Sequence, residues 1–80
     1  MGLAKDEKEL ADRASRFLKA ELKRANMTYG ELAEKLKEHG LPDETADSIK
    51  SKLARGTFAA TFFLASLAAL GLEGCSLEQL

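Results

Sequence analysis

The longest stretch without a charged side chain, residues 56–72, restricts the possible folds of this chain more than any other feature. It contains Thr57, Thr61 and Ser66, and it is shorter than the roughly 20 apolar residues that span a bilayer. From Phe58 to Leu70 apolar side chains recur nearly all round a helix. We therefore expect a buried helix that is covered on more than one side, and no membrane segment.

The length of 80 residues allows one domain, which we place at residues 1–80 with a core over about 6–72 and a tail over 73–80. Twelve basic residues against thirteen acidic ones give a net charge of −1, so an anionic partner must be met by a local patch. Cys75 and His39 are the single residues of their types, which argues against a disulfide or a zinc site. We expect a cytoplasmic protein without metal or cofactor.

Three helical patterns precede the uncharged run, and no strand-like alternation occurs. The first spans Asp6 to Ala25 and ends at Asn26, with Arg16, Lys19 and Lys23 opposite its apolar stripe. The stripe comprises Leu10, Ala14, Phe17, Leu18, Leu22 and Ala25.

The second and third helices are delimited by capping residues. The second has about ten residues, begins with a capping box of Thr28 and Glu31, and is closed by Gly40. The third begins after Pro42, with Asp43 the preferred N-cap and Thr45 the alternative, and ends at Arg55 before Gly56. We expect Ala46, Ile49 and Leu53 to face inward, Thr57 to cap the last helix, and Ser76 to cap a short turn in the tail.

These patterns predict an all-α protein, a compact bundle of four to five helices of the helix-turn-helix type. We expect one shared core beneath the second, third and last helices. It should contain Leu32, Leu36, Ile49, Leu53, Phe62 and Leu67.

Residues 27–36 resemble the opening of the phage-repressor-like helix-turn-helix family, and residues 51–56 resemble the end of its recognition helix. The sequence differs from that pattern at Tyr29, where many repressors have Gln, and in a longer 40–56 stretch. Residues 14–72, with Arg-Gly-Thr-Phe at 55–58 and Phe62-Phe63, are still more similar to a small bacterial family of unknown function. The resemblance implies a fold rather than an activity.

The likeness to helix-turn-helix proteins suggests double-stranded DNA as the partner, for a bacterial transcriptional regulator or a phage-derived accessory protein. Helical spacing turns the third helix's polar side chains outward, where they would meet a DNA groove. With Arg16, Lys19 and Lys23, its basic residues would contact phosphates. The candidate DNA-binding residues are Thr28, Tyr29, Ser48, Lys50, Ser51, Lys52 and Arg55.

An alternative hypothesis is a protein-interaction or dimerisation module that has the fold but no DNA site. The acidic start of the third helix and the near-zero net charge favour it. Separately, the surplus of apolar side chains after Gly56 predicts a homodimer formed through the last helix and the tail, which is also compatible with DNA binding. The candidate homodimer interface is Phe63, Leu64, Leu70 and Leu72. A competing arrangement has the first helix cover that surface through Leu10, Phe17 and Leu18.

The sequence contains no arrangement typical of an active site. We find no catalytic triad, no paired carboxylates and no metal-ligand spacing. The glycines are scattered at helix ends, so they do not form a phosphate-binding loop. We therefore expect no enzymatic activity.

Overall fold

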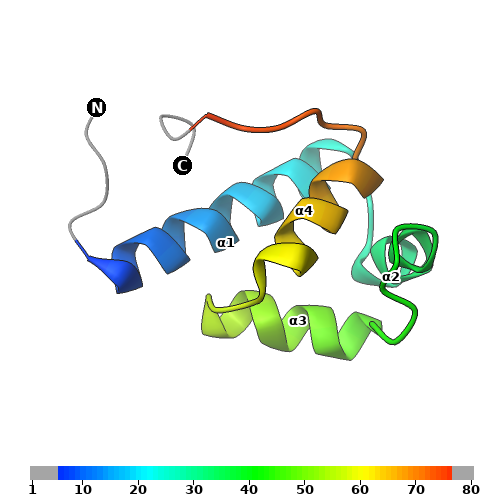
Figure 1. Ribbon diagram of the computed structural model, residues 1–80, viewed down its shortest axis with the longest axis horizontal. Coiled ribbons are helices and arrows are strands. Elements are labelled where there is room, and N and C mark those ends of the chain that lie inside the picture. Colours follow the sequence, from blue (N-terminus) through cyan, green and yellow to red (C-terminus); the bar gives the residue numbers. More distant parts are fainter. Residues whose placement is uncertain (1–5, 77–80) are drawn as a thin grey trace.

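The computed structural model describes residues 6–76 and contains four α-helices in that range. They are α1 (Glu7–Arg24), α2 (Tyr29–Lys37), α3 (Ala46–Arg55) and α4 (Ala60–Ala69) (Figure 1). No strand occurs between residues 6 and 76. The expectation of an all-α protein is confirmed.

The shorter helices surround one end of a long first helix. Helix α2 packs against both α3 and α4, and α1 packs against α3. In Figure 1 α1 runs from lower left to upper right, while α3 lies below it and runs in the opposite sense.

The expected ends of α1 and α2 are confirmed. The Asp6 side chain accepts a hydrogen bond from the Glu9 backbone N–H, and Asn26 ends α1 in the left-handed region at φ 55°. Thr28 and Glu31 form a reciprocal capping box at the start of α2. Gly40, at φ 89°, lets the Leu41 N–H reach the Leu36 carbonyl and close that helix.

The starts of α3 and α4 differ from the sequence predictions. The N-cap of α3 is Thr45 rather than Asp43, because Thr45 and Ser48 satisfy each other's backbone N–H groups and Asp43 lies in the preceding turn. Thr57 does not cap α4, whose N-cap is Ala59 without a side-chain hydrogen bond. Residues 57–59 are non-helical, so α4 is shorter than the 58–70 segment expected.

The core lies where α2, α3 and α4 meet the second half of α1. Its cluster of buried residues contains five of the six residues predicted to meet there, together with three others: Leu32, Leu36, Ile49, Leu53 and Phe62, with Leu18, Leu22 and Ala33. The sixth, Leu67, is also buried, with 5% of its surface exposed, but it lies outside this cluster.

Helix α4 is not buried all round, contrary to the prediction. Phe62, Ser66 and Leu67 face the core, whereas Leu64 is 62% exposed. Ala60, Thr61 and Ala68 are exposed beside Leu64, which leaves one uncharged face in solvent. Leu10 and Ala25, assigned to the apolar stripe of α1, are exposed as well, and so is Ala46 at the start of α3.

The four phenylalanines join α1 to α4. The centroid of the Phe58 ring lies 5.3 Å from that of Phe62 and 6.1 Å from that of Phe63, and the Phe63 and Phe17 centroids are 6.4 Å apart. Gly56 allows this arrangement, because its positive φ of 77°, which glycine adopts without steric cost, turns the chain sharply at the end of α3. The Arg-Gly-Thr-Phe segment therefore acts as a corner between α3 and the aromatic cluster.

The tail adds no helix within the described residues. After Gly71, residues 72–76 are irregular and lead back toward the first turns of α1 in the view of Figure 1. The expected turn that begins at Ser76 lies largely in residues 77–80, outside the described range. No helix of the described part has the length and apolarity that a membrane crossing requires.

Two buried serines should respond in opposite ways to truncation. The Ser15 hydroxyl donates a 2.6 Å hydrogen bond to the Leu53 carbonyl, whereas the Ser66 hydroxyl is buried without a partner. We expect Ser15→Ala to lower the free energy of unfolding by about 1–2 kcal/mol. Ser66→Ala should leave it unchanged or raise it by up to about 1 kcal/mol, since it removes an unsatisfied hydroxyl. Urea denaturation would check both, and equal losses would contradict the assignment.

Candidate nucleic-acid interface

The outer surface of α3 carries most of the residues predicted to contact DNA. Lys50, Ser51 and Arg55 are exposed, and so is Asp47. Ile49 and Leu53 are buried on the opposite side, which fixes the orientation of the helix. The helical spacing therefore gave the correct outward direction for these polar side chains.

The basic residues of the chain divide into those with and those without a carboxylate partner. Within residues 6–76, Lys8, Arg13, Arg24, Lys37 and Lys52 form ion pairs. The other basic residues of that range form none: Arg16, Lys19, Lys23, Lys35, Lys50 and Arg55. All of these except Lys35 lie on α1 or α3, so the cations without an ion pair are concentrated on these two helices.

A groove of about 350 Å³ separates the outer faces of α1 and α3. Asp12, Arg16 and Lys19 line it from α1, and Ala54 lines it from α3. Lys50 lies one helical turn before Ala54 and therefore on the same side of α3. We call Arg16, Lys19, Lys23 and Lys50, with this groove, the α1–α3 face.

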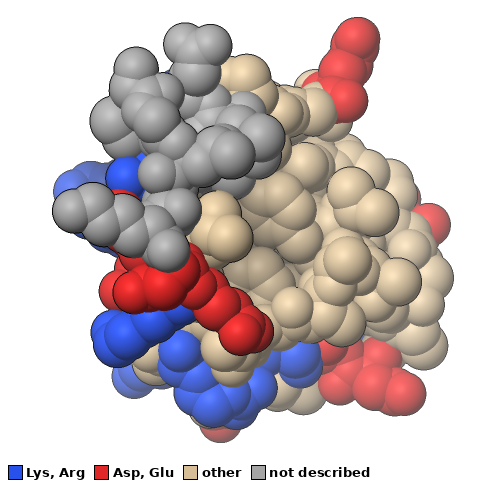
Figure 2. Space-filling model, turned by 60° about the vertical axis from the view of Figure 1, so that its left-hand side comes forward, with Lys and Arg blue, Asp and Glu red and all other residues tan. Residues whose placement is uncertain are grey.

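Negative charge is also present around this face. Lys8 holds the Asp12 carboxylate at 3.4 Å, and Glu7 and Asp12 lie beside Arg55 at the end of α3. Figure 2 shows the resulting band of blue and red side chains next to a broad uncharged surface. On this face positive and negative side chains are therefore interspersed (Figure 2), and the cations of the described range do not form a continuous basic surface.

Lys52 and Ser48 are engaged within the chain, unlike the other predicted contacts on α3. The Lys52 Nζ lies 3.0 Å from both carboxylate oxygens of Glu44 and 5.6 Å from the centre of the Phe62 ring. The Ser48 hydroxyl donates to Glu44 at 2.6 Å and accepts from the Thr45 N–H at 2.8 Å. Glu44, expected to point outward, instead anchors the α2–α3 loop to α3.

Burial raises the pKa of Glu44, but the hydrogen bonds from Ser48 and Lys52 outweigh burial and hold the pKa below its ordinary value. A carboxyl group with a lowered pKa in the folded state contributes stability above its unfolded pKa and loses it as the pH falls. The Glu44 contacts should therefore stabilise the fold at neutral pH and weaken in acid.

We expect Glu44→Gln to lower the free energy of unfolding at pH 7 by about 1–2 kcal/mol, because Lys52 loses its counter-ion. The difference from the wild type should shrink in acid, as the pH falls below the ordinary glutamate pKa of about 4.3 and through the lower pKa of folded Glu44, because the wild-type carboxyl group is then protonated as well. Urea denaturation at neutral pH and in acid measures it. Glu34→Gln is the control, because the Glu34–Lys37 pair is solvent-exposed. A difference that persists unchanged in acid would contradict this account.

Thr28 and Tyr29 have structural roles at the start of α2. The Thr28 hydroxyl accepts from the Glu31 N–H, and the Thr28 N–H donates to Glu31 at 2.8 Å. The hydrogen bond from the Thr28 N–H to the Glu31 carboxylate, and after it the interaction of that carboxylate with the Thr28 side chain, hold the pKa of Glu31 below its ordinary value. Tyr29 is half-buried and packs against the core. Both residues lie at the start of α2, and neither lines the groove between α1 and α3.

The predicted dimer residues are divided between core and surface. Phe63 and Leu70 are half-buried and pack against the core of their own chain, and Leu72 is half-buried. Phe17 and Leu18 of α1 cover part of this side, as the competing arrangement expected, although Leu10 remains 44% exposed. Leu64 is the member of the set that is open to solvent.

Two site features were missed by sequence reasoning. The buried Ser15 hydroxyl, which fixes α1 to α3 beside the groove, carries no distinctive sequence signal. The Glu44–Ser48–Lys52 contacts have only a partial signal: the three residues are spaced by four, but Glu44 lies in the loop before α3, where helical periodicity does not apply. Among residues 6–76, no group of His, Cys, Asp and Glu side chains could hold a metal ion.

Comparison with known proteins places the chain in a family. Residues 10–75 match the family described as Domain of unknown function (DUF6471). The chain is a member of the DUF6471 family. The match covers all four helices of this DUF6471 protein from the second turn of α1 onward. It also includes the Arg-Gly-Thr-Phe corner and the α1–α3 face. No curated protein and no solved structure matches the chain significantly.

Proposed function

We propose that this protein binds double-stranded DNA through phosphate contacts made by the α1–α3 face. The observation that carries the proposal is the distribution of basic residues without ion pairs. Within residues 6–76 all of them except Lys35 lie on α1 or α3. Cations that form no ion pair can exchange small ions for phosphates, and this exchange dominates the affinity of DNA-binding proteins.

The arrangement of α2 and α3 supports this proposal. The helix-turn-helix plan that the sequence resembles also has two short helices in succession, the second with an exposed polar surface, although the connection of residues 38–45 is longer than the usual turn of that motif. The loop between them, residues 38–45, holds α3 in place through Glu44. In this proposal α3 approaches the DNA while α1 crosses the phosphate backbone, as a regulator or accessory DNA-binding protein would require.

The test is a titration of a labelled duplex of about 20 base pairs, followed by fluorescence anisotropy at several salt concentrations. We expect saturable binding that weakens with salt, with a slope of log K against log salt of about −3 to −5, because three to five cations would meet phosphates. No binding at about 50 mM salt would reject the proposal.

A second candidate role is homodimerisation through the outer face of α4. It is favoured by Leu64, which is 62% exposed between small uncharged side chains. Because Phe63 and Leu70 pack within their own chain, the interface would be centred on Leu64. Sedimentation equilibrium at micromolar concentrations tests this role. A dimer that Leu64→Glu dissociates would support it, and a monomeric mass throughout would reject it.

A further inference from the structure

The donors available on α3 determine how this face could read DNA. Base edges in the major groove present mainly acceptors, namely N7 and O6 of guanine, N7 of adenine and O4 of thymine. Recognition helices meet these edges with residues near their N-terminus. Sequence-specific reading by α3 would therefore require free hydrogen-bond donors in its first turn.

The first turn of α3 offers no such side-chain donor. Ala46 has no polar group, and Asp47 is an exposed carboxylate. Ser48 donates its hydroxyl hydrogen to Glu44. One turn later, Lys52 is held by the same carboxylate at 3.0 Å. Glu44 thus occupies two of the donors that the sequence assigned to DNA.

Beyond the first turn, α3 exposes Lys50 and Ser51. The other donors are on α1, where the Arg16 Nε donates to the Asp12 carbonyl at 3.4 Å and the other guanidinium nitrogens have no partner among residues 6–76. Arg16 and Lys19 line the groove between α1 and α3, and Lys50 is on the flank of α3 next to it. A helix that crosses the backbone, as α1 does in the proposed mode, contacts phosphates rather than bases. The cations are therefore placed to follow the phosphate backbone.

Resting on the proposed function, we infer that the α1–α3 face binds duplex DNA by its phosphate backbone and discriminates little between base sequences. Asp47, close to the DNA at the start of α3, weakens binding to every duplex by repelling phosphates. The ligand class is B-form DNA of any sequence rather than a defined operator.

The experiment measures dissociation constants for an A·T-rich duplex, a G·C-rich duplex and a random-sequence pool, with one round of enrichment from the pool. We expect the constants to agree within about threefold, because specific recognition separates sites by about a thousandfold or more. An enriched sequence that binds over about a hundredfold tighter would overturn the inference while supporting the proposed function. Failure of every duplex to bind would reject the proposed function and the inference with it.

Asp47→Asn provides a second, independent readout. We expect it to tighten binding to all three duplexes alike by about two- to fivefold, because it removes a charge that faces phosphates. Glu38→Gln removes the same charge from the end of α2 and should change affinity little. If Asp47→Asn weakened binding to one duplex alone, Asp47 would be accepting a hydrogen bond from a cytosine amino group and the inference would be wrong.

Discussion

Phe62→Ala should lower the free energy of unfolding by about 3–5 kcal/mol, the cost typical of truncating a buried aromatic side chain. Phe62 is 2% exposed, belongs to the core cluster with Ile49 and Leu53, and lies 5.3 Å from the Phe58 ring. A domain of this size has only about 5–15 kcal/mol in total, so a large fall in the denaturation midpoint is expected.

Leu64→Ala is the matched control for this prediction. Leu64 lies on the same helix but is 62% exposed, so the change in the free energy of unfolding should stay below about 0.5 kcal/mol. Urea denaturation followed by circular dichroism measures both variants. Similar midpoints for the two variants would show that α4 is packed with another face inward.

Neutralising the α1–α3 face should have the largest effect on DNA binding. The variant Arg16→Gln/Lys19→Gln/Lys50→Gln removes three cations without carboxylate partners. Removing one cation from a phosphate should weaken binding about five- to tenfold at ~0.1 M salt, so the triple variant should bind at least about a hundredfold more weakly. The slope of log K against log salt should become less negative by about three.

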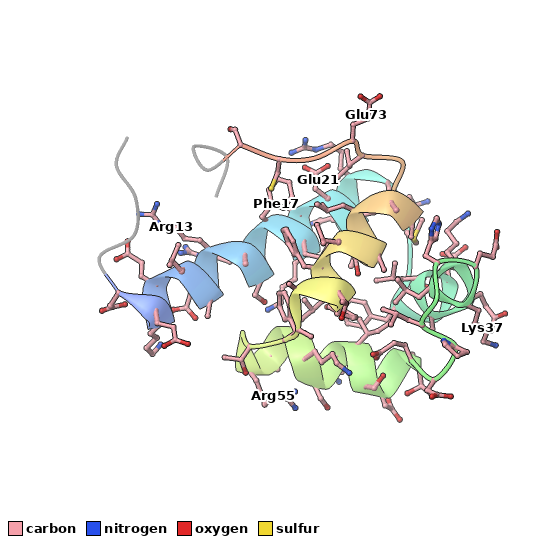
Figure 3. All side chains as sticks on the ribbon, viewed as in Figure 1. Arg13, Phe17, Glu21, Lys37, Arg55 and Glu73 are labelled. Atoms are coloured by element: carbon pink, nitrogen blue, oxygen red, sulfur yellow. The ribbon has the colours of Figure 1, made fainter. Side chains whose placement is uncertain are left out.

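A second triple variant separates this effect from that of net charge. Arg24→Gln/Lys35→Gln/Lys37→Gln removes the same charge from the end of α1 and from α2. Figure 3 shows Lys37 on α2, well separated from Arg55 at the end of α3. We expect the affinity of this variant to fall by less than about threefold, because distant charges are screened. Equal effects in both variants would mean that binding depends on net charge alone.

Much of the fold follows from local sequence signals. The Thr28 capping box, the left-handed Asn26 and the glycines at positions 40 and 56 define the ends of helices through backbone chemistry that acts over a few residues. Apolar spacing correctly placed Ile49 and Leu53 in the core. These features depend on neighbours in sequence, which explains why they are visible without a structure.

The remaining features depend on contacts between segments. Asp43 and Thr45 are both good N-caps, and the choice rests on the reciprocal hydrogen bonds that Ser48 makes. Helix α4 begins only at Ala60, because the non-helical residues 57–59 place the Phe58 ring against the aromatic cluster. Helical periodicity could not show either effect.

The candidate site, too, was predictable from the sequence only where it depends on local spacing. The exposure of Lys50 and Arg55 followed from the helical position of the apolar residues. The engagement of Lys52 did not, because its partner Glu44 lies in a loop whose path periodicity cannot define. The α1 cations lie beside α3 because the two helices pack closely. The Ser15 hydroxyl donates to the Leu53 carbonyl, and Gly56 lies close to Ala11 and Asp12 of α1.

The most direct test of the proposed interface is a map of backbone amide chemical shifts as a short duplex is added to the isotope-labelled protein. We expect the largest changes on the outer side of α1 around Arg16, Lys19 and Lys23 and on α3 around Lys50, with little change on α4. Changes concentrated on α4 around Leu64, or no changes at saturating DNA, would contradict the assignment of this face to DNA.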